Sequence, residues 1–147
     1  MRLRVMRQRG FTLIEIMVVV VIIGMLAALV LPRVLGRLDD SRIAKSKSDI
    51  RTLSSALKLY QLDNFNYPST QQGLEALIKT PAGDPPAKNW KSGGYIERLP
   101  ADPWGNEYQY LSPGDKMEFD IWSFGADGRL GGEGVAADIG NWNLDGR

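Results

Sequence analysis

The residues best suited to chemistry are acidic, and three of them lie close together near the C-terminus. Asp127, Glu133 and Asp138 are interspersed with six glycines between residues 125 and 140. Ordering a glycine-rich loop is entropically unfavourable, and neighbouring carboxylates repel one another. A hard cation offsets both effects, and Ca²⁺ accepts roughly six to eight oxygen ligands in flexible geometry. The spacing of an EF-hand is absent, so a calcium site and a plain surface loop both remain open.

A fourth acid stands alone near the N-terminus. Glu15 is the single charge between Phe11 and Leu31. A carboxylate inside an apolar helix costs on the order of a few kcal/mol in the membrane. Glu15 follows Phe11 by four residues, which is about 6 Å along a helix. Its position alone allows two interpretations: the side chain reaches the headgroup region, or it needs a cationic partner inside the membrane.

The residue types that are absent restrict the chemistry further. The chain contains no His and no Cys, which removes the commonest general base, the usual zinc ligands and any disulfide framework. No P-loop, Gly-x-Ser-x-Gly or metal-hydrolase motif occurs. A pair of acids could in principle form among Asp102, Asp115, Glu118 and Asp120, but acids in loops and on strand faces are expected to be solvated. The four tryptophans are expected in the core. The sequence therefore predicts a protein that is not an enzyme.

The charge balance argues against a nucleic-acid-binding protein. The 147 residues include 18 Lys+Arg and 17 Asp+Glu, a formal net charge of +1, whereas nucleic-acid binders usually carry a basic excess. The near-neutrality conceals four blocks. Residues 1–10 carry +4, residues 11–31 carry −1, residues 32–101 carry +4 and residues 102–147 carry −6.

The second block predicts a membrane anchor. The 21 residues from Phe11 to Leu31 would span about 31 Å as a helix, which matches a hydrocarbon core of ~30 Å. The preceding arginines predict that the N-terminus faces the cytoplasm. No Ala-x-Ala site follows the segment, so a retained transmembrane helix is favoured over an ordinary cleaved signal peptide.

Apolar periodicity predicts a long helix over residues 33–62, continuing the membrane segment. Its apolar face is formed by Ile43, Ile50, Leu53, Leu57 and Tyr60. This face is expected to pack on the following domain. The polar faces of the helix are expected to contact other subunits. Pro32 lacks an N–H donor and is expected to interrupt the helix at the membrane boundary. Ser69 and Gln72 have capping-box spacing, which predicts a short helix at about residues 70–79.

The remainder of the chain predicts a small sheet. Prolines and glycines predict a loop over residues 81–94. Alternating apolar residues predict strands at 107–111 and 117–123, joined by a turn at 112–115. The predicted fold class is α+β, with a long N-terminal helix packed on a small antiparallel sheet.

The N-terminal residues carry a specific resemblance. Gly10-Phe11-Thr12-Leu13-Ile14-Glu15, between an Arg-rich leader and an apolar helix, resembles the type III signal of type IV pilins and pseudopilins. The resemblance implies that a membrane prepilin peptidase cleaves between Gly10 and Phe11 and that Phe11 is then N-methylated. Cleavage would leave 14 basic and 17 acidic residues. It also implies that Glu15 pairs with the new N-terminus of a neighbouring subunit and sets the register of a filament.

Three further stretches narrow the resemblance to the major pseudopilins of type II secretion systems: Asp63 to Leu74, Pro100 to Tyr110 and Ser123 to Trp142. A pilin-like fold follows, with a leader at 1–10, a transmembrane helix at 11–31 and a periplasmic domain at 32–147, anchored in the bacterial inner membrane. The implied function is to polymerise into a periplasmic helical filament that drives export of folded proteins across the outer membrane. The implied partners are further copies of itself, minor pseudopilins, the inner-membrane secretion platform, the peptidase and membrane lipid. The alternative is a type IV pilin for adhesion, motility or DNA uptake, which usually has a C-terminal Cys pair.

The same resemblance implies that Ca²⁺ binds in the C-terminal loop. The implied side-chain ligands are Asp127, Asp138 and Glu133, and the implied backbone carbonyls are those of Phe124, Arg129 and Leu130. Many relatives carry an additional Asp or Asn near Glu133. Whether the Glu133 carboxylate or the carbonyls of residues 129 and 130 complete the coordination stays open. In a chain without disulfides, the metal would take over their stabilising role.

Overall fold

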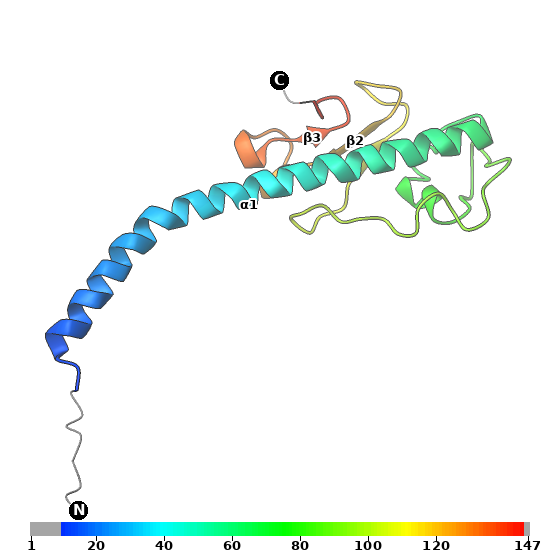
Figure 1. Ribbon diagram of the computed structural model, residues 1–147. Helices are drawn as coiled ribbons and strands as arrows, with labels where there is room; N and C mark the ends of the chain where they lie inside the picture. Colours follow the sequence, from blue (N-terminus) through cyan, green and yellow to red (C-terminus); the bar gives the residue numbers. More distant parts are fainter. Residues whose placement is uncertain (1–9, 146–147) are drawn as a thin grey trace, which may run out of the picture. The chain divides into compact units, whose positions relative to one another are not determined.

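One helix dominates the order of elements. The structure is a computed structural model that describes residues 10–145, with the side chains of residues 31–35 left out of the description. Helix α1 extends over Leu13–Asn64, 52 residues (Figure 1). It therefore joins the predicted membrane segment to the predicted helix at 33–62. The predicted leader lies outside the described residues except for Gly10.

The prediction that Pro32 interrupts the helix is wrong. The helical assignment continues through this residue. Proline removes only its own N–H donor, and the flanking residues Leu29 to Leu31 and Val34 to Leu35 are apolar and not glycine. The α-helix therefore continues on either side of the proline.

The chain divides into two units between Leu38 and Asp39, and α1 contributes to both. In the first unit, the helical segment Leu13–Val30 has a mean hydropathy of 3.0 and none of it is buried. Its large apolar side chains are 48–72% exposed, apart from Leu13 at 79%. By length and composition, this segment is able to cross a membrane. Apolar side chains exposed on every side of a helix require an apolar surrounding, either lipid or other helices.

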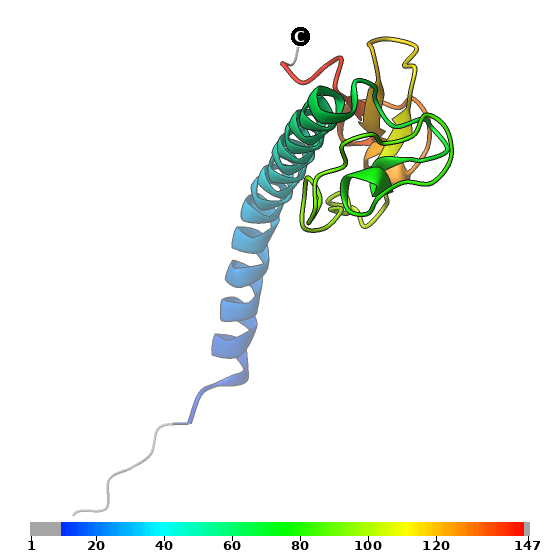
Figure 2. The ribbon, with the colours of Figure 1, turned by 90° about the vertical axis from the view of Figure 1, so that its right-hand side faces the viewer.

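The second unit contains a three-stranded antiparallel sheet in the order β1-β2-β3. Its strands are β1 (Gln109–Leu111), β2 (Asp120–Ser123) and β3 (Ile139–Gly140). Tyr110 pairs with Ile121, and Ser123 pairs with Ile139. In Figure 2 the sheet and its loops lie along one side of the α1 residues that belong to this unit. The predicted helix on a small antiparallel sheet is confirmed, whereas β3 was not predicted.

Both predicted strands are longer than those observed. The second strand begins late because a buried carboxylate holds the connection between β1 and β2. Asp120 is 3% exposed. It accepts hydrogen bonds from the backbone N–H groups of Asp115 (2.8 Å), Lys116 (3.0 Å) and Met117 (3.0 Å). These donors are thereby unavailable to a strand ladder. The predicted turn at 112–115 thus extends into residues that were assigned to the second strand.

The predicted helix at 70–79 is reduced to one short 3₁₀ helix, η1 (Leu74–Leu77). The capping box forms as predicted: Ser69 N–H donates to Gln72 Oε1 (2.9 Å), and Gln72 N–H donates to Ser69 Oγ (3.3 Å). Gly73 then adopts a φ of 63°. A left-handed residue cannot continue a right-handed helix, so the capped turn and η1 remain separate.

The core lies between α1 and the sheet. The predicted apolar stripe is confirmed: Ile50, Leu53, Leu57 and Tyr60 are at most 1% exposed. Ile121 of β2 is fully buried against them. Side chains alternate along a strand, so the adjacent Trp122 lies on the other face, where its ring is 6.2 Å from that of Trp142. The prediction of core tryptophans therefore holds for Trp90 and Trp104, which pack on the core cluster, but not for this pair.

Two leucines on α1 provide a test of this packing. Leu57 is fully buried and Leu59 is 53% exposed. We expect Leu57→Ala to lower the free energy of unfolding by about 2–5 kcal/mol, because it removes buried methyl groups and leaves a cavity. The matched Leu59→Ala should change it by less than about 0.5 kcal/mol. Urea denaturation of the full chain in detergent, followed by tryptophan fluorescence, measures both. Equal losses would contradict the assignment of the buried face.

Candidate functional site

The predicted metal-binding residues all lie in the connection between β2 and β3, drawn in orange in Figure 1. The pairing of Ser123 with Ile139 closes the base of this β2–β3 loop, residues 124–138. Two 3₁₀ helices form within it, η2 (Gly125–Asp127) and η3 (Gly134–Ala136). Phe124 and Asp138, the first and last predicted ligands, each adjoin one residue of this pair. The structure therefore places them close together at the base of the loop.

The carboxylate of Asp138 reaches across the loop. Its Oδ2 accepts a hydrogen bond from the Gly131 N–H at 2.9 Å. Its Oδ1 is buried and has no hydrogen-bond partner among the described residues. A buried anionic oxygen without a partner is energetically unfavourable and calls for a ligand, such as a cation or ordered water.

The other two predicted acids remain at the surface. Asp127 is exposed and its Oδ1 accepts a hydrogen bond from the Arg129 N–H at 3.1 Å. Glu133 is exposed and immediately precedes η3. Within residues 10–145, no three acidic side chains lie close enough to form a metal cluster. The structure therefore directs the Asp138 carboxylate across the loop to Gly131 but does not gather the three carboxylates around one point.

The available donors nevertheless suit a hard cation. The carbonyl oxygens of Arg129 and Leu130 accept no hydrogen bond from the described part of the chain. With the unpaired Asp138 Oδ1 and the exposed Asp127 carboxylate, the loop offers only oxygen donors, which is the set that Ca²⁺ prefers. The residues present thus fit a calcium ion by the chemistry of their donors.

Two glycines bring the halves of the loop into close contact. Gly125 has a φ of 70°, and a Cβ there would lie 2.8 Å from the Ala137 carbonyl oxygen and 2.9 Å from that of Val135. A Cβ at Gly132 would collide with the Ala136 carbonyl. Only glycine allows both the left-handed φ and this backbone approach. The glycine content of the loop is therefore partly a packing requirement.

Sequence reasoning missed the role of Asp102. Acids of this region were expected to be solvated, and Asp115 and Glu118 are exposed. In contrast, Asp102 is 4% exposed and Asp120 3%. Neither is hydrogen-bonded to another carboxylate among residues 10–145; each accepts its bonds from N–H or O–H donors instead. The spacing Asp-x-Trp-x-Asn, with backbone N–H groups two and four residues later, is the signal of a local turn that sequence reasoning could have used.

Asp102 also borders a buried tyrosine. Burial raises the pKa of the Tyr108 phenol well above its ordinary value. The phenol donates a hydrogen bond to Asp49 Oδ2 at 3.0 Å. This carboxylate raises the pKa further, and the charge of Asp102 adds to the effect. Tyr108 therefore stays protonated and links α1 to the segment that precedes β1.

The N-terminal candidate, Glu15, takes part in a helix cap that sequence reasoning also missed. Glu15 N–H donates to Thr12 Oγ1 at 3.3 Å, and Thr12 N–H donates to Glu15 Oε2 at 3.4 Å. This reciprocal pair is a capping box, and the spacing Thr-x-x-Glu was its signal. The predicted processing residues Gly10 and Phe11 are exposed and precede α1. The described N-terminal segment thus presents an exposed junction next to a capped helix.

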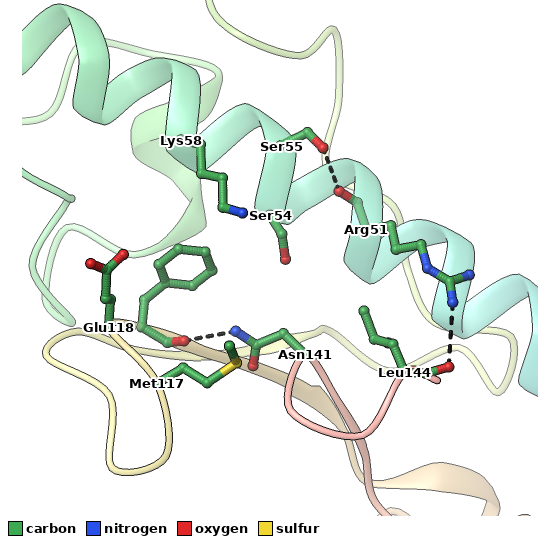
Figure 3. A pocket seen from close by; sticks show the side chains of 9 residues that line it. Arg51, Ser54, Ser55, Lys58, Met117, Glu118, Asn141 and Leu144 are labelled. Carbon is green, nitrogen blue, oxygen red and sulfur yellow. Dashed lines mark hydrogen bonds between the residues drawn. The ribbon is translucent and has the colours of Figure 1, made fainter. Parts of the chain in front are cut away.

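A groove of about 460 Å³ lies between α1 and the C-terminal segment (Figure 3). Arg51 closes one end, since its Nη2 donates to the Leu144 carbonyl at 3.3 Å and lies 3.4 Å from Asp145 Oδ1. Glu118, which lines the groove, accepts a hydrogen bond from the Tyr67 hydroxyl at 3.0 Å. These contacts connect Leu144 and Asp145 to α1, and the β1–β2 connection to the segment that follows α1.

Comparisons with known proteins identify close relatives. The family described as type II secretion system (T2SS), protein G, matches residues 33–142, and the prokaryotic N-terminal methylation motif matches residues 5–31. The chain is 61% identical to the type II secretion system core protein G of Pseudomonas aeruginosa, covering 93% of this chain and 96% of the relative. It is 56% identical to that of Vibrio cholerae, covering 94% of both.

A solved structure is also similar. It is the crystal structure of the major pseudopilin from the type 2 secretion system of enterohaemorrhagic Escherichia coli, with a TM-score of 0.66 and 46% sequence identity. The similarity covers 74% of this chain and 92% of that chain. The similarity therefore extends from sequence to fold.

Proposed function

Since this chain belongs to the family of type II secretion system protein G, we propose that it is the major structural subunit of a type II secretion pseudopilus. It polymerises into a periplasmic filament that drives export of folded proteins across the outer membrane. The observation that carries this function is the combination in one chain of an exposed apolar helix, Leu13–Val30, an N-terminal methylation motif and the protein G unit at residues 33–142.

The apolar helix supports both states of such a subunit. Before assembly, lipid covers its exposed side chains and anchors the chain in the inner membrane. The arginines of the leader keep the N-terminus in the cytoplasm, where a prepilin peptidase cleaves between Gly10 and Phe11. In the filament, helices of neighbouring copies replace the lipid. A head-to-tail contact between different surfaces of identical subunits generates an open helical filament when the rotation between subunits does not close into a ring.

Glu15 is proposed to set the register of this assembly. Cleavage creates an ammonium group at Phe11, and the exposed Glu15 side chain makes only one hydrogen bond, at 3.4 Å, to Thr12 within the described chain. An ion pair with the terminus of a neighbouring copy would offset the cost of a carboxylate in an apolar surrounding. Minor pseudopilins and the inner-membrane secretion platform are proposed as the other partners.

A type IV pilin for adhesion, motility or DNA uptake is not favoured. The two relatives described above are both core protein G of type II secretion systems, and further relatives in Aeromonas hydrophila and Klebsiella pneumoniae bear the same name. The chain has no Cys and so cannot close the C-terminal disulfide loop of many pilins.

Complementation tests the filament function and the role of Glu15 together. In a strain that lacks this gene, the native chain should restore export of folded enzymes, and Glu15→Ala should restore less than a tenth of it because register is lost. The matched control is Glu75→Ala, an exposed acid whose partner is Lys79 of its own turn, which should export normally. Normal export in the deletion strain together with loss of surface pili would instead support the pilin function.

We further propose that the β2–β3 loop binds Ca²⁺. Asp138 and Asp127 would hold the ion with their carboxylates, and Phe124, Arg129 and Leu130 with their backbone carbonyls, while Glu133 would supply a further carboxylate or leave its place to water. The ion supplies positive charge that stabilises neighbouring carboxylates and orders a glycine-rich loop. The unpaired buried Oδ1 of Asp138 supports this proposal.

Calcium removal tests the metal site. At a free Ca²⁺ concentration about 100-fold above the Kd, binding to the folded state alone should raise the melting midpoint by on the order of 10 °C over that in EGTA. Asp138→Ala should abolish this difference. Asp145→Ala, an exposed acid outside the loop, should retain it. Identical midpoints of the native chain in calcium and in EGTA would refute the site.

A further inference from the structure

Asp102 is a buried carboxylate without an ion-pair partner in the described part of the chain. It is 4% exposed, and none of the four ion pairs found among residues 10–145 includes it. Its Oδ1 accepts the N–H groups of Trp104 (3.0 Å) and Asn106 (2.7 Å). Its Oδ2 accepts the Ser123 hydroxyl at 2.6 Å. Hydrogen bonds alone therefore hold a charge that is unfavourable to bury.

Ser123 connects this carboxylate to the β2–β3 loop. The serine is fully buried, and its Oγ donates to Asp102 and accepts the Gly125 N–H at 3.1 Å. Because Ser123 also pairs with Ile139, the connection lies where the chain enters and leaves the loop. The serine hydroxyl therefore uses its one hydrogen to donate to Asp102 and one lone pair to accept from Gly125, which fixes its orientation.

Gly125 in turn packs against the second half of the loop. A Cβ added at Gly125 would lie within 3 Å of the carbonyl oxygens of Val135 and Ala137, so the two halves of the loop are in close backbone contact there. The carbonyl of Phe124 stands between Ser123 and Gly125 in the chain, and Asp138 directly follows Ala137. A continuous set of contacts thus connects the Asp102 carboxylate to both ends of the proposed ligand set.

We infer that Asp102 is a positioning residue for the calcium site, acting through the Ser123 hydroxyl on the backbone at Phe124 and Gly125. Its buried negative charge also favours a cation in the adjacent loop. The inference rests on the calcium proposal above and adds a residue outside the loop to it. Groups that hold metal ligands in place through hydrogen bonds commonly change metal affinity by about 10- to 100-fold when removed.

The chain offers a matched control for a purely structural effect. Asp120 is as deeply buried, at 3% exposure, and accepts three backbone N–H groups. It lies on the same strand as Ser123, but at the opposite end, where it holds the β1–β2 connection and not the metal loop. Asp102→Asn and Asp120→Asn each remove one buried charge while keeping the shape of the side chain.

The test uses the full chain in detergent, titrated with calcium chloride by calorimetry, with melting midpoints measured in EGTA. We expect Asp102→Asn to raise the calcium Kd at least tenfold. Asp120→Asn should lower the midpoint in EGTA but leave the Kd within about twofold of native. Ser123→Ala keeps the charge and removes the connection, so it should also raise the Kd, and it decides the matter if Asp102→Asn does not fold.

The outcomes separate the inference from its premise. If the native chain binds calcium and Asp102→Asn and Ser123→Ala bind it equally well, the inference is overturned while the calcium site stands. Equal weakening by Asp102→Asn and Asp120→Asn would also overturn it, because the effect would then be a general loss of folding. If the native chain binds no calcium, the calcium proposal fails and the inference fails with it.

Discussion

The second unit, from Asp39 onward, depends on the burial of one face of α1. Its three strands contain three, four and two residues, and so small a sheet is not stable without a hydrophobic surface to pack on. Ile50, Leu53, Leu57 and Tyr60 provide that surface. The same helix continues into a segment that is apolar on all sides. One helix therefore both contributes to the core of the second unit and carries an apolar segment whose side chains are exposed.

The strands are short, and buried carboxylates accept backbone N–H groups that longer strands would otherwise pair. Asp120 satisfies three backbone N–H groups of the β1–β2 connection, and Asp102 satisfies two in the turn before β1. Unpaired buried N–H groups would destabilise these loops. The proposed calcium ion fits the same pattern, because it would satisfy oxygen atoms of a loop that has few internal hydrogen bonds. Polar contacts thus stabilise the connections between the short strands, beside the apolar core.

Elements with a strong period were predictable from the sequence, and elements set by single contacts were not. The membrane segment, the stripe from Ile43 to Tyr60 and the capping box at Ser69 follow from spacing alone. The strand ends, the early stop at Gly73 and the burial of Asp102 depend on tertiary contacts or on a left-handed φ, which no periodicity records. For the candidate site, the sequence indicated the loop and its acids. It did not indicate that Asp138 alone would be drawn inward, or that Ser123 would connect the loop to Asp102.

The central claim is that the chain is processed and then polymerised as a pseudopilin subunit. Its most direct test is the intact mass of the chain recovered from filaments sheared from cells that overproduce it. The account predicts a single species that begins at Phe11 and carries one methyl group, sedimenting as a polymer. A chain that retains residues 1–10, or that is recovered only as a monomer from the membrane, would contradict it.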